Sequence, residues 1–173
     1  LVLLDLATGL RQGELLALNW EDIDLSNKTL TVNKSVKEVY IYEDENNRHI
    51  ETIFQVPKTQ NSFRTISIPD VIISVLKKGK NKNGLVFHNA DGKPLRAKNV
   101  SYQWKKILAD CNIPHKKFHS IRHTYASMLL KNGVDIETVA ELMGHSAISI
   151  TQIYLHSSNN QKQDAVNKLN YLF

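Results

Sequence analysis

Hydrophobic and polar positions change their spacing along the chain and divide it into a short helical start, a β-rich middle and a helical remainder. The apolar run in residues 1–8 predicts a helix, and residues 12–18 predict a second one after a break at Gly9. Between residues 23 and 68, apolar and β-branched residues alternate with polar ones, which is typical of strands. We expect a small antiparallel sheet from these strands: Thr29–Val32, Ser35–Tyr42, Glu51–Val56 and Arg64–Ile68.

Helical spacing returns after the β-rich middle. Pro69 stands at a helix start, and the apolar residues behind it predict a helix that ends at Gly79. Leu85–Phe87 predicts a short buried strand or extended segment. The chain is then expected to be helical to its end, with these helices: Asn99–Cys111, residues 119–130, residues 135–143 and the tail. The predicted fold class is α+β, a mainly helical domain with a small antiparallel β-sheet.

Composition narrows the class of binding partner and the cellular compartment. The chain has 22 Lys and Arg against 17 Asp and Glu, a net charge of +5, which favours a polyanionic partner, although any basic globular protein could have this balance. Cys111 is the single cysteine, so no intrachain disulfide can form and a reducing compartment is expected. No apolar stretch approaches the roughly 18 residues of a membrane span. We expect a cytoplasmic protein without a membrane partner.

The length of 173 residues predicts one domain, residues 1–173. The chain opens without Met, inside an apolar run that already predicts helix. This opening indicates an excised C-terminal domain whose N-terminal partner is missing.

Candidate chemistry lies in the last third of the chain. In a helix over residues 119–130, His119 and Arg122 share one face and can approach the same anion. Gly144 is placed to end the preceding helix, so His145 is the first residue of the turn beyond it. Tyr154 follows nine residues later among polar neighbours. A phenol has an ordinary pKa of about 10, and several cations at one site favour the phenolate, which makes it a usable nucleophile.

Two further basic elements precede this cluster. Arg11 lies at a predicted helix junction, and Glu14 three positions later can hold its guanidinium in one orientation. In isolation, Arg11 would more often be a solvated surface charge. Lys58 lies in the turn between the last two predicted strands, where a long side chain can swing toward a ligand.

Taken in order, Arg11, Lys58, His119 with Arg122, His145 and Tyr154 resemble the active-site set of the tyrosine recombinases, the integrase family of site-specific DNA recombinases. The resemblance spans about residues 1 to 160 and implies double-stranded DNA as partner, a homotetramer on DNA, and no metal, ATP or other cofactor. It implies that the two arginines clamp the non-bridging phosphate oxygens and that Tyr154 forms a 3′-phosphotyrosyl link. The remaining implied roles are these: Lys58 protonates the departing 5′-oxygen, His119 assists proton movement at the tyrosine, His145 donates a hydrogen bond to the phosphate, and Glu14 supports Arg11.

Other interpretations stay open. The i,i+4 spacing of His119 and His123 could serve zinc, but Cys111 stands alone and Arg122 would put a cation beside the metal. His123 is more often a packing or hydrogen-bonding residue, and His115 an exposed one. A type IB topoisomerase uses the same residues, and a DNA-binding relative could have lost catalysis.

Two finer predictions concern the sheet region and the tail. The sheet region is longer than the compact hairpin of chromosome-dimer-resolving members and looks more like that of integrases from temperate phages and conjugative transposons. In the tail, Val166, Leu169, Asn170 and Phe173 form a mostly apolar stripe that could dock on its own core or on another protomer.

Overall fold

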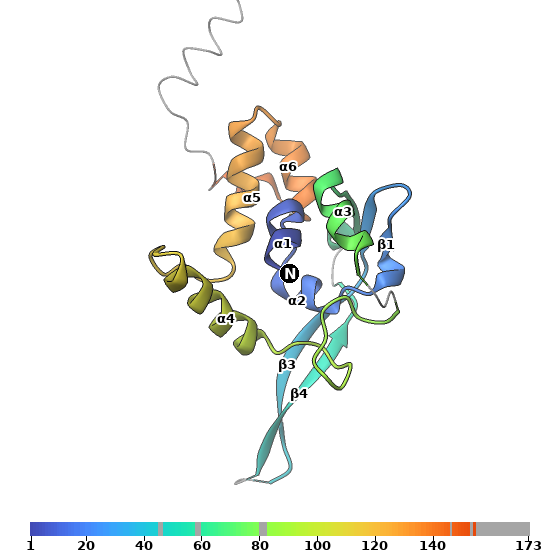
Figure 1. The fold of residues 1–173 in the computed structure, drawn as a ribbon, viewed down its shortest axis with the longest axis vertical. Coiled ribbons are helices and arrows are strands. Elements are labelled where there is room, and N and C mark those ends of the chain that lie inside the picture. The colour runs from blue at the N-terminus through green and yellow to red at the C-terminus, as the bar shows by residue number, and fades with distance from the viewer. Residues whose placement is uncertain (45–46, 58–59, 80–82, 146, 153, 155–173) are drawn as a thin grey trace, which may run out of the picture.

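The computed structural model describes residues 1–44, 47–57, 60–79, 83–145, 147–152 and 154, and it confirms the predicted α+β class (Figure 1). Helices make up most of the described elements, and the strand pairs are antiparallel. The elements in chain order are α1 (Val2–Thr8), α2 (Gln12–Ala17), a 3₁₀ turn (Trp20–Asp22), β1 (Ile23–Asp24), β2 (Thr29–Val32), β3 (Ser35–Tyr42), β4 (Arg48–Gln55), a 3₁₀ turn (Gln60–Ser62), β5 (Arg64–Ser67), α3 (Asp70–Lys77), α4 (Ala97–Asp110), α5 (Ser120–Lys131), α6 (Ile136–Met143) and α7 (Ile148–Gln152).

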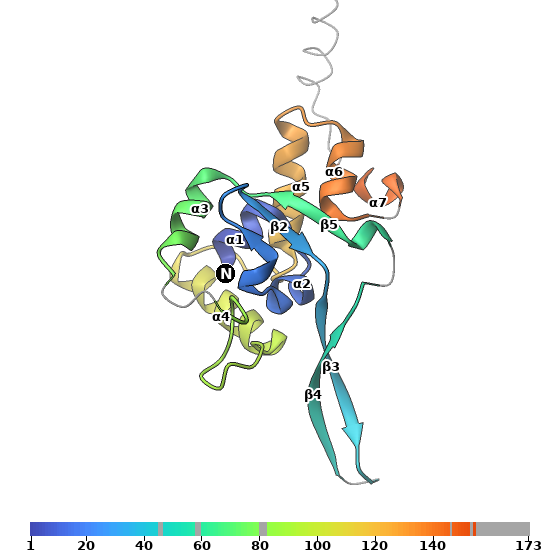
Figure 2. The same cartoon turned by 90° about the vertical axis from the view of Figure 1, so that its right-hand side faces the viewer.

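The strands form two separate antiparallel ladders rather than the single sheet that we expected. The first has the order β1-β2-β5, and the second pairs β3 with β4 alone. β4 begins three residues before the predicted Glu51, because its first residues pair with the outer half of β3, up to Tyr42 opposite Arg48. The β3–β4 hairpin projects away from the helices (Figure 2).

The break between α1 and α2 follows from a glycine in a left-handed conformation. Gly9 caps α1 at φ 59°, and its N–H donates to the Asp5 carbonyl oxygen. An added Cβ would lie 2.2 Å from Cδ1 of Tyr125, so both the backbone and the packing require glycine here. This tight fit places the start of α2, and with it Arg11, close to α5.

Helices α3, α4, α5 and α6 match their predictions within about two residues, a normal variation at helix ends, whereas the predicted tail helix lies outside the described residues. Pro69 and Asp135 precede α3 and α6 as expected, and the Asp135 side chain accepts a hydrogen bond from the Thr138 N–H at 2.8 Å. The segment around Leu85 is not a regular strand, since it makes an isolated bridge to Asn19.

The main core surrounds α1, which lies between α5 and α3 (Figure 1). Residues from α1, α2, β2, β5 and α3 fill it, and a second cluster joins Tyr125, Ala126, Val139, Met143 and Tyr154. Tyr125 is therefore a core residue. In contrast, Met128 on the same helix is 54% exposed.

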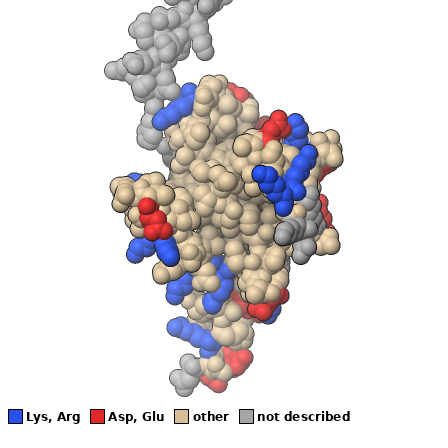
Figure 3. All heavy atoms as spheres, viewed as in Figure 1, with Lys and Arg blue, Asp and Glu red and all other residues tan. Residues whose placement is uncertain are grey.

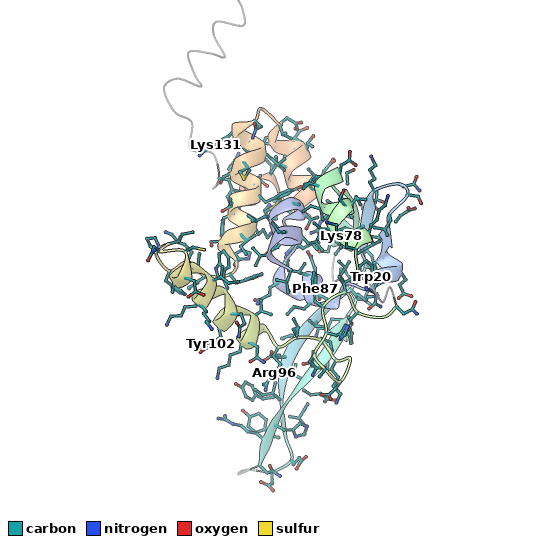
Figure 4. All side chains as sticks on the ribbon, viewed as in Figure 1. Trp20, Lys78, Phe87, Arg96, Tyr102 and Lys131 are labelled. Atoms are coloured by element: carbon teal, nitrogen blue, oxygen red, sulfur yellow. The ribbon has the colours of Figure 1, made fainter. Side chains whose placement is uncertain are left out.

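Exposed groups are spread over the outer surface. Tyr102 points outward from α4 and is 67% exposed (Figure 4). On the face drawn in Figure 3, Lys and Arg form separate groups rather than one continuous patch. In the part of the chain that the structure describes, no helix is long and apolar enough to cross a membrane.

Candidate active site

Three arginines from three different elements bind the C-terminal end of α6. Nε of Arg64 donates to the Leu142 carbonyl oxygen at 2.8 Å, a terminal nitrogen of Arg122 donates to that of Met143, and Nη2 of Arg11 donates to that of Gly144 at 2.8 Å. The last carbonyls of a helix have no partner within the helix and carry partial negative charge. Guanidinium groups donate the missing hydrogen bonds and balance that charge. α2, β5 and α5 thereby converge on one turn.

Glu14 joins two of these arginines. Its carboxylate accepts hydrogen bonds from Nη1 and the backbone N–H of Arg11, each at 2.8 Å, and from Nη2 and Nη1 of Arg64 at 2.8 and 3.2 Å. Burial disfavours the charged form of Glu14, but bonds and charge from Arg64 and Arg11 outweigh it and hold the pKa of Glu14 below its ordinary value. The expected contact with Arg11 is present. The role of Arg64 was missed, because an arginine at a strand start gives no sign that it will be buried.

Arg11 and Arg122 differ strongly in exposure. The Arg11 side chain is 40% exposed, so it can meet a ligand while it keeps its bonds to Glu14 and Gly144. Arg122 is 2% exposed, and Nη1 donates to the Gly9 carbonyl oxygen. Burial and the nearby Arg11 charge lower the pKa of Arg122 to about 10, so it remains charged at neutral pH.

His145 is held just beyond α6 by the helix end that its sequence predicted. Gly144 is left-handed at φ 62°, its N–H donates to the Glu141 carbonyl oxygen, and the His145 N–H donates to that of Ala140. Nδ1 of His145 lies 2.8 Å from Oγ1 of Thr151 in α7. Burial, followed by the charges of Arg122 and Arg11, lowers the pKa of His145 to about 4, so the ring is neutral at pH 7.

Tyr154 is 8% exposed and packs between two imidazoles. Its ring is nearly parallel to that of His145, with centroids 6.4 Å apart, and lies 5.0 Å from that of His123. His123 also contacts His119 edge to face, at 4.9 Å between centroids. His119 precedes α5 as its N-cap and is exposed by its overall surface. Partial desolvation of its ring, followed by the charges of His123 and Arg122, lowers the pKa of His119. His123 was expected to pack, and it does so between His119 and the tyrosine.

Burial decides the ionisation of Tyr154. It raises the pKa of Tyr154 above its ordinary value, although the charges of Arg122 and Arg11 act in the opposite direction. The cations therefore act as expected, but they do not make the phenolate the favoured form in this structure. The phenol keeps its proton at neutral pH and must lose it during any reaction.

The structure brings together Arg11, Glu14, Arg122, His145 and Tyr154, with His119 reaching the group through His123. Lys58 lies outside the described residues, as does the apolar stripe of the tail. Among the described residues, no group of three or more His, Cys, Asp and Glu side chains could hold a metal ion.

Comparison with known proteins gives a consistent family. The phage integrase family model matches residues 1–161. A protein of Caldanaerobacter subterraneus subsp. tengcongensis named "Tyrosine recombinase XerC-like" is 45% identical over 191 aligned residues, which cover 100% of this chain and 49% of that protein. The tyrosine recombinase XerC of Pediococcus pentosaceus is 33% identical and covers 93% of this chain and 50% of its own length. The chain thus spans about half the length of these relatives.

Solved structures share the fold at low identity. The Tn1549 transposon integrase, solved in complex with transposon right end DNA, aligns with a TM-score of 0.75 at 22% identity and covers 98% of this chain and 57% of that one. The catalytic domain of bacteriophage HP1 integrase aligns with a TM-score of 0.60 at 22% identity and covers 96% of this chain and 78% of that one.

Proposed function

The chain belongs to the phage integrase family, and from this premise we propose that it is the catalytic domain of a site-specific DNA recombinase or integrase. It cuts and rejoins DNA strands through a 3′-phosphotyrosyl intermediate, without metal or ATP. The observation that carries the proposal is the convergence of Arg11, Arg122 and His145 around Tyr154. The matched relatives named above are recombinases and integrases, so neither the topoisomerase nor the non-catalytic alternative is favoured.

The cations bind and polarise the scissile phosphate. Arg11 presents its half-exposed guanidinium to a non-bridging oxygen, and Arg122 supplies a second, buried positive charge. Such fixed charges stabilise the negative charge that builds on the equatorial oxygens during phosphoryl transfer. Glu14 and the carbonyls at the end of α6 keep both guanidinium groups oriented in advance, so little reorganisation is needed when DNA binds.

Tyr154 is the nucleophile. Its Oη forms a bond to phosphorus while the bond from phosphorus to the 5′-oxygen breaks, which leaves a 3′-phosphotyrosyl ester and a 5′-hydroxyl. Since burial favours the protonated phenol, a base must take its proton in this step, and His119 assists this transfer. Lys58 protonates the departing 5′-oxygen, and His145 donates a hydrogen bond to the phosphate.

The ester stores roughly the energy of the diester that it replaces, so a second 5′-hydroxyl can reverse the step without ATP. Exchange of strands needs two DNA sites and several active sites, and we infer a homotetramer on double-stranded DNA, acting on the nucleoid in the cytoplasm. The domain spanning residues 1–173 is C-terminal in this proposal, with DNA-binding domains N-terminal to it. The comparison with temperate-phage and conjugative-transposon integrases stays a prediction.

A trapping assay tests the proposal. The chain is incubated with a nicked DNA duplex from which the 5′-hydroxyl fragment diffuses away after cleavage, and the covalent protein–DNA adduct is measured on a denaturing gel. Wild-type protein should form the adduct, and Tyr154→Phe should abolish it while DNA binding persists. Tyr102→Phe is the matched control, because Tyr102 is exposed on α4, and it should leave the adduct unchanged.

Two outcomes contradict the proposal. An undiminished adduct in Tyr154→Phe would assign the nucleophile to another residue. Strong loss of the wild-type adduct in EDTA would show that the reaction needs a metal ion.

A further inference from the structure

Thr151 contacts His145 from a completely buried position. Its exposed fraction is 0%, and its Oγ1 lies 2.8 Å from Nδ1 of His145. The Tyr154 ring is nearly parallel to the imidazole, at an interplanar angle of 10° with centroids 6.4 Å apart. His145 is therefore held by its backbone at the end of α6, by the tyrosine ring and by one hydroxyl.

The direction of this hydrogen bond follows from the needs of the hydroxyl. Three other helical hydroxyls, those of Thr8, Ser74 and Thr124, donate to the carbonyl four residues earlier, at 2.7, 2.9 and 3.0 Å. Among the described residues, Thr151 makes no such bond, and Nδ1 of His145 is its sole hydrogen-bond partner. A buried hydroxyl that donates to nothing carries a penalty, so the Thr151 O–H donates and Nδ1 accepts.

A neutral imidazole carries one proton, and the nitrogen that accepts a hydrogen bond cannot also hold it. With Nδ1 as acceptor, the proton is on Nε2. His145 is neutral at pH 7, since burial and the charges of Arg122 and Arg11 lower its pKa to about 4. Nε2 has no hydrogen-bond partner among the described residues, so its N–H is available to a ligand.

We propose that Thr151 is a positioning residue that fixes His145 in the Nε2–H tautomer, so that the ring offers a donor to a phosphate oxygen. The opposite tautomer would turn a lone pair toward that oxygen and repel it. The phosphate part of this inference rests on the proposed function, whereas the tautomer does not.

The first test reads the tautomer directly. Nitrogen-15 NMR of the histidine-labelled chain distinguishes protonated from unprotonated ring nitrogens, and a His145→Gln sample assigns the His145 signals. In the wild type, Nε2 should be protonated and Nδ1 should not. Thr151→Val keeps the shape but removes the donor and should yield a mixture of tautomers, while Thr151→Ser should keep the Nε2–H form. Thr124→Val, on the exposed side of α5, should change nothing.

The second test measures adduct formation by the same variants on the nicked duplex. Thr151→Val should slow it about tenfold to a hundredfold, the range known for hydrogen-bond partners that orient metal-ligating histidines, with unchanged DNA affinity. Thr151→Ser should restore most of the rate. A merely structural role would predict equal losses of rate and affinity and no change of tautomer.

The inference is overturned if wild-type His145 carries its proton on Nδ1, or if Thr151→Val retains both the Nε2–H tautomer and the full rate. If Thr151→Val fails to fold, the wild-type and Thr151→Ser spectra still decide the tautomer. If the wild type forms no adduct at all, the proposed function is wrong, and so is the role of His145 as a donor to the phosphate. The NMR measurement still tests the hydrogen bond between Thr151 and His145 independently.

Discussion

Replacing Asp5 by Asn should stabilise the fold increasingly as the pH rises. Asp5 lies on α1 inside the main core and is 1% exposed, and its Oδ1 has no hydrogen-bond partner in the described part of the chain. Burial raises the pKa of Asp5 from 3.8 to about 7, although the charge of Arg122 acts against this shift. The folded protein therefore prefers the protonated carboxyl, which an asparagine side chain resembles in shape and charge.

The sign and size of this stability difference follow from proton linkage. Because the folded pKa of Asp5 lies above the unfolded one, its contribution to stability is fully present below pH 3.8 and is lost as the pH rises through about 7. A shift of about 3 pKa units at 1.36 kcal/mol per unit costs the wild type about 4 kcal/mol at pH 8 and above. About 3 kcal/mol of this loss falls between pH 5 and pH 8, because about 2 units of the shift lie in that range.

Urea unfolding at pH 5 and pH 8 measures this difference for the wild type and Asp5→Asn. With slopes of about 1 to 3 kcal/mol per molar urea, the gap between the two midpoints should widen by about 1 to 3 M at the higher pH. Asp110→Asn, on the exposed end of α4, is the matched control and should show no such widening. If the asparagine variant instead loses stability relative to the wild type as pH rises, Asp5 is ionised and paired with Arg122, and the reasoning is wrong.

Three other substitutions test separate parts of the structure. Glu14→Gln should lower the free energy of unfolding by about 3 to 5 kcal/mol, since it leaves the buried Arg64 without its counter-charge. The control Glu51→Gln, at an exposed position, should have almost no effect, and equal urea midpoints for the two variants would contradict the prediction. Gly9→Ala should lower the free energy of unfolding by about 1 to 3 kcal/mol more than Gly92→Ala does, because both residues have positive φ but only at Gly9 would a Cβ meet the buried Tyr125 ring. Similar losses in urea unfolding would mean that this ring moves aside. Lys58→Ala should slow adduct formation about a hundred- to ten-thousand-fold and recover when the bridging 5′-oxygen is replaced by sulfur; equal impairment on both substrates would make Lys58 a binding residue.

Local sequence signals were sufficient where a residue's neighbours along the chain determine its environment. The strands Thr29–Val32 and Ser35–Tyr42 match the prediction because alternation and turn residues mark both ends. The start of β4 does not, since only the partner strand extends it to Arg48. For the same reason, the division into two ladders could not be predicted from strand signals, which carry no pairing information.

The same distinction between local and tertiary signals holds for the candidate site. Its motif residues could be recognised from their type and order, but the residues that hold them could not. Arg64 looks like a solvated charge in sequence and becomes a buried partner of Glu14 only because β5 packs beside α6. Asp5 did leave a signal that could have been used, a single carboxylate inside an apolar helical run. Thr151 left none, as a threonine near a helix end is ordinary.

The ionisation of Tyr154 is the clearest case in which charges alone mislead. Counting cations predicts a phenolate, because sequence reveals the charges but not the loss of solvent around the hydroxyl. In the structure, that loss outweighs Arg122 and Arg11, and the phenol remains protonated. In the proposed reaction, the protonated phenol must therefore lose its proton as its oxygen bonds to phosphorus. The imidazole of His123 contacts both Tyr154 and the exposed His119. It therefore lies on the path that the proton would take from the phenol to His119.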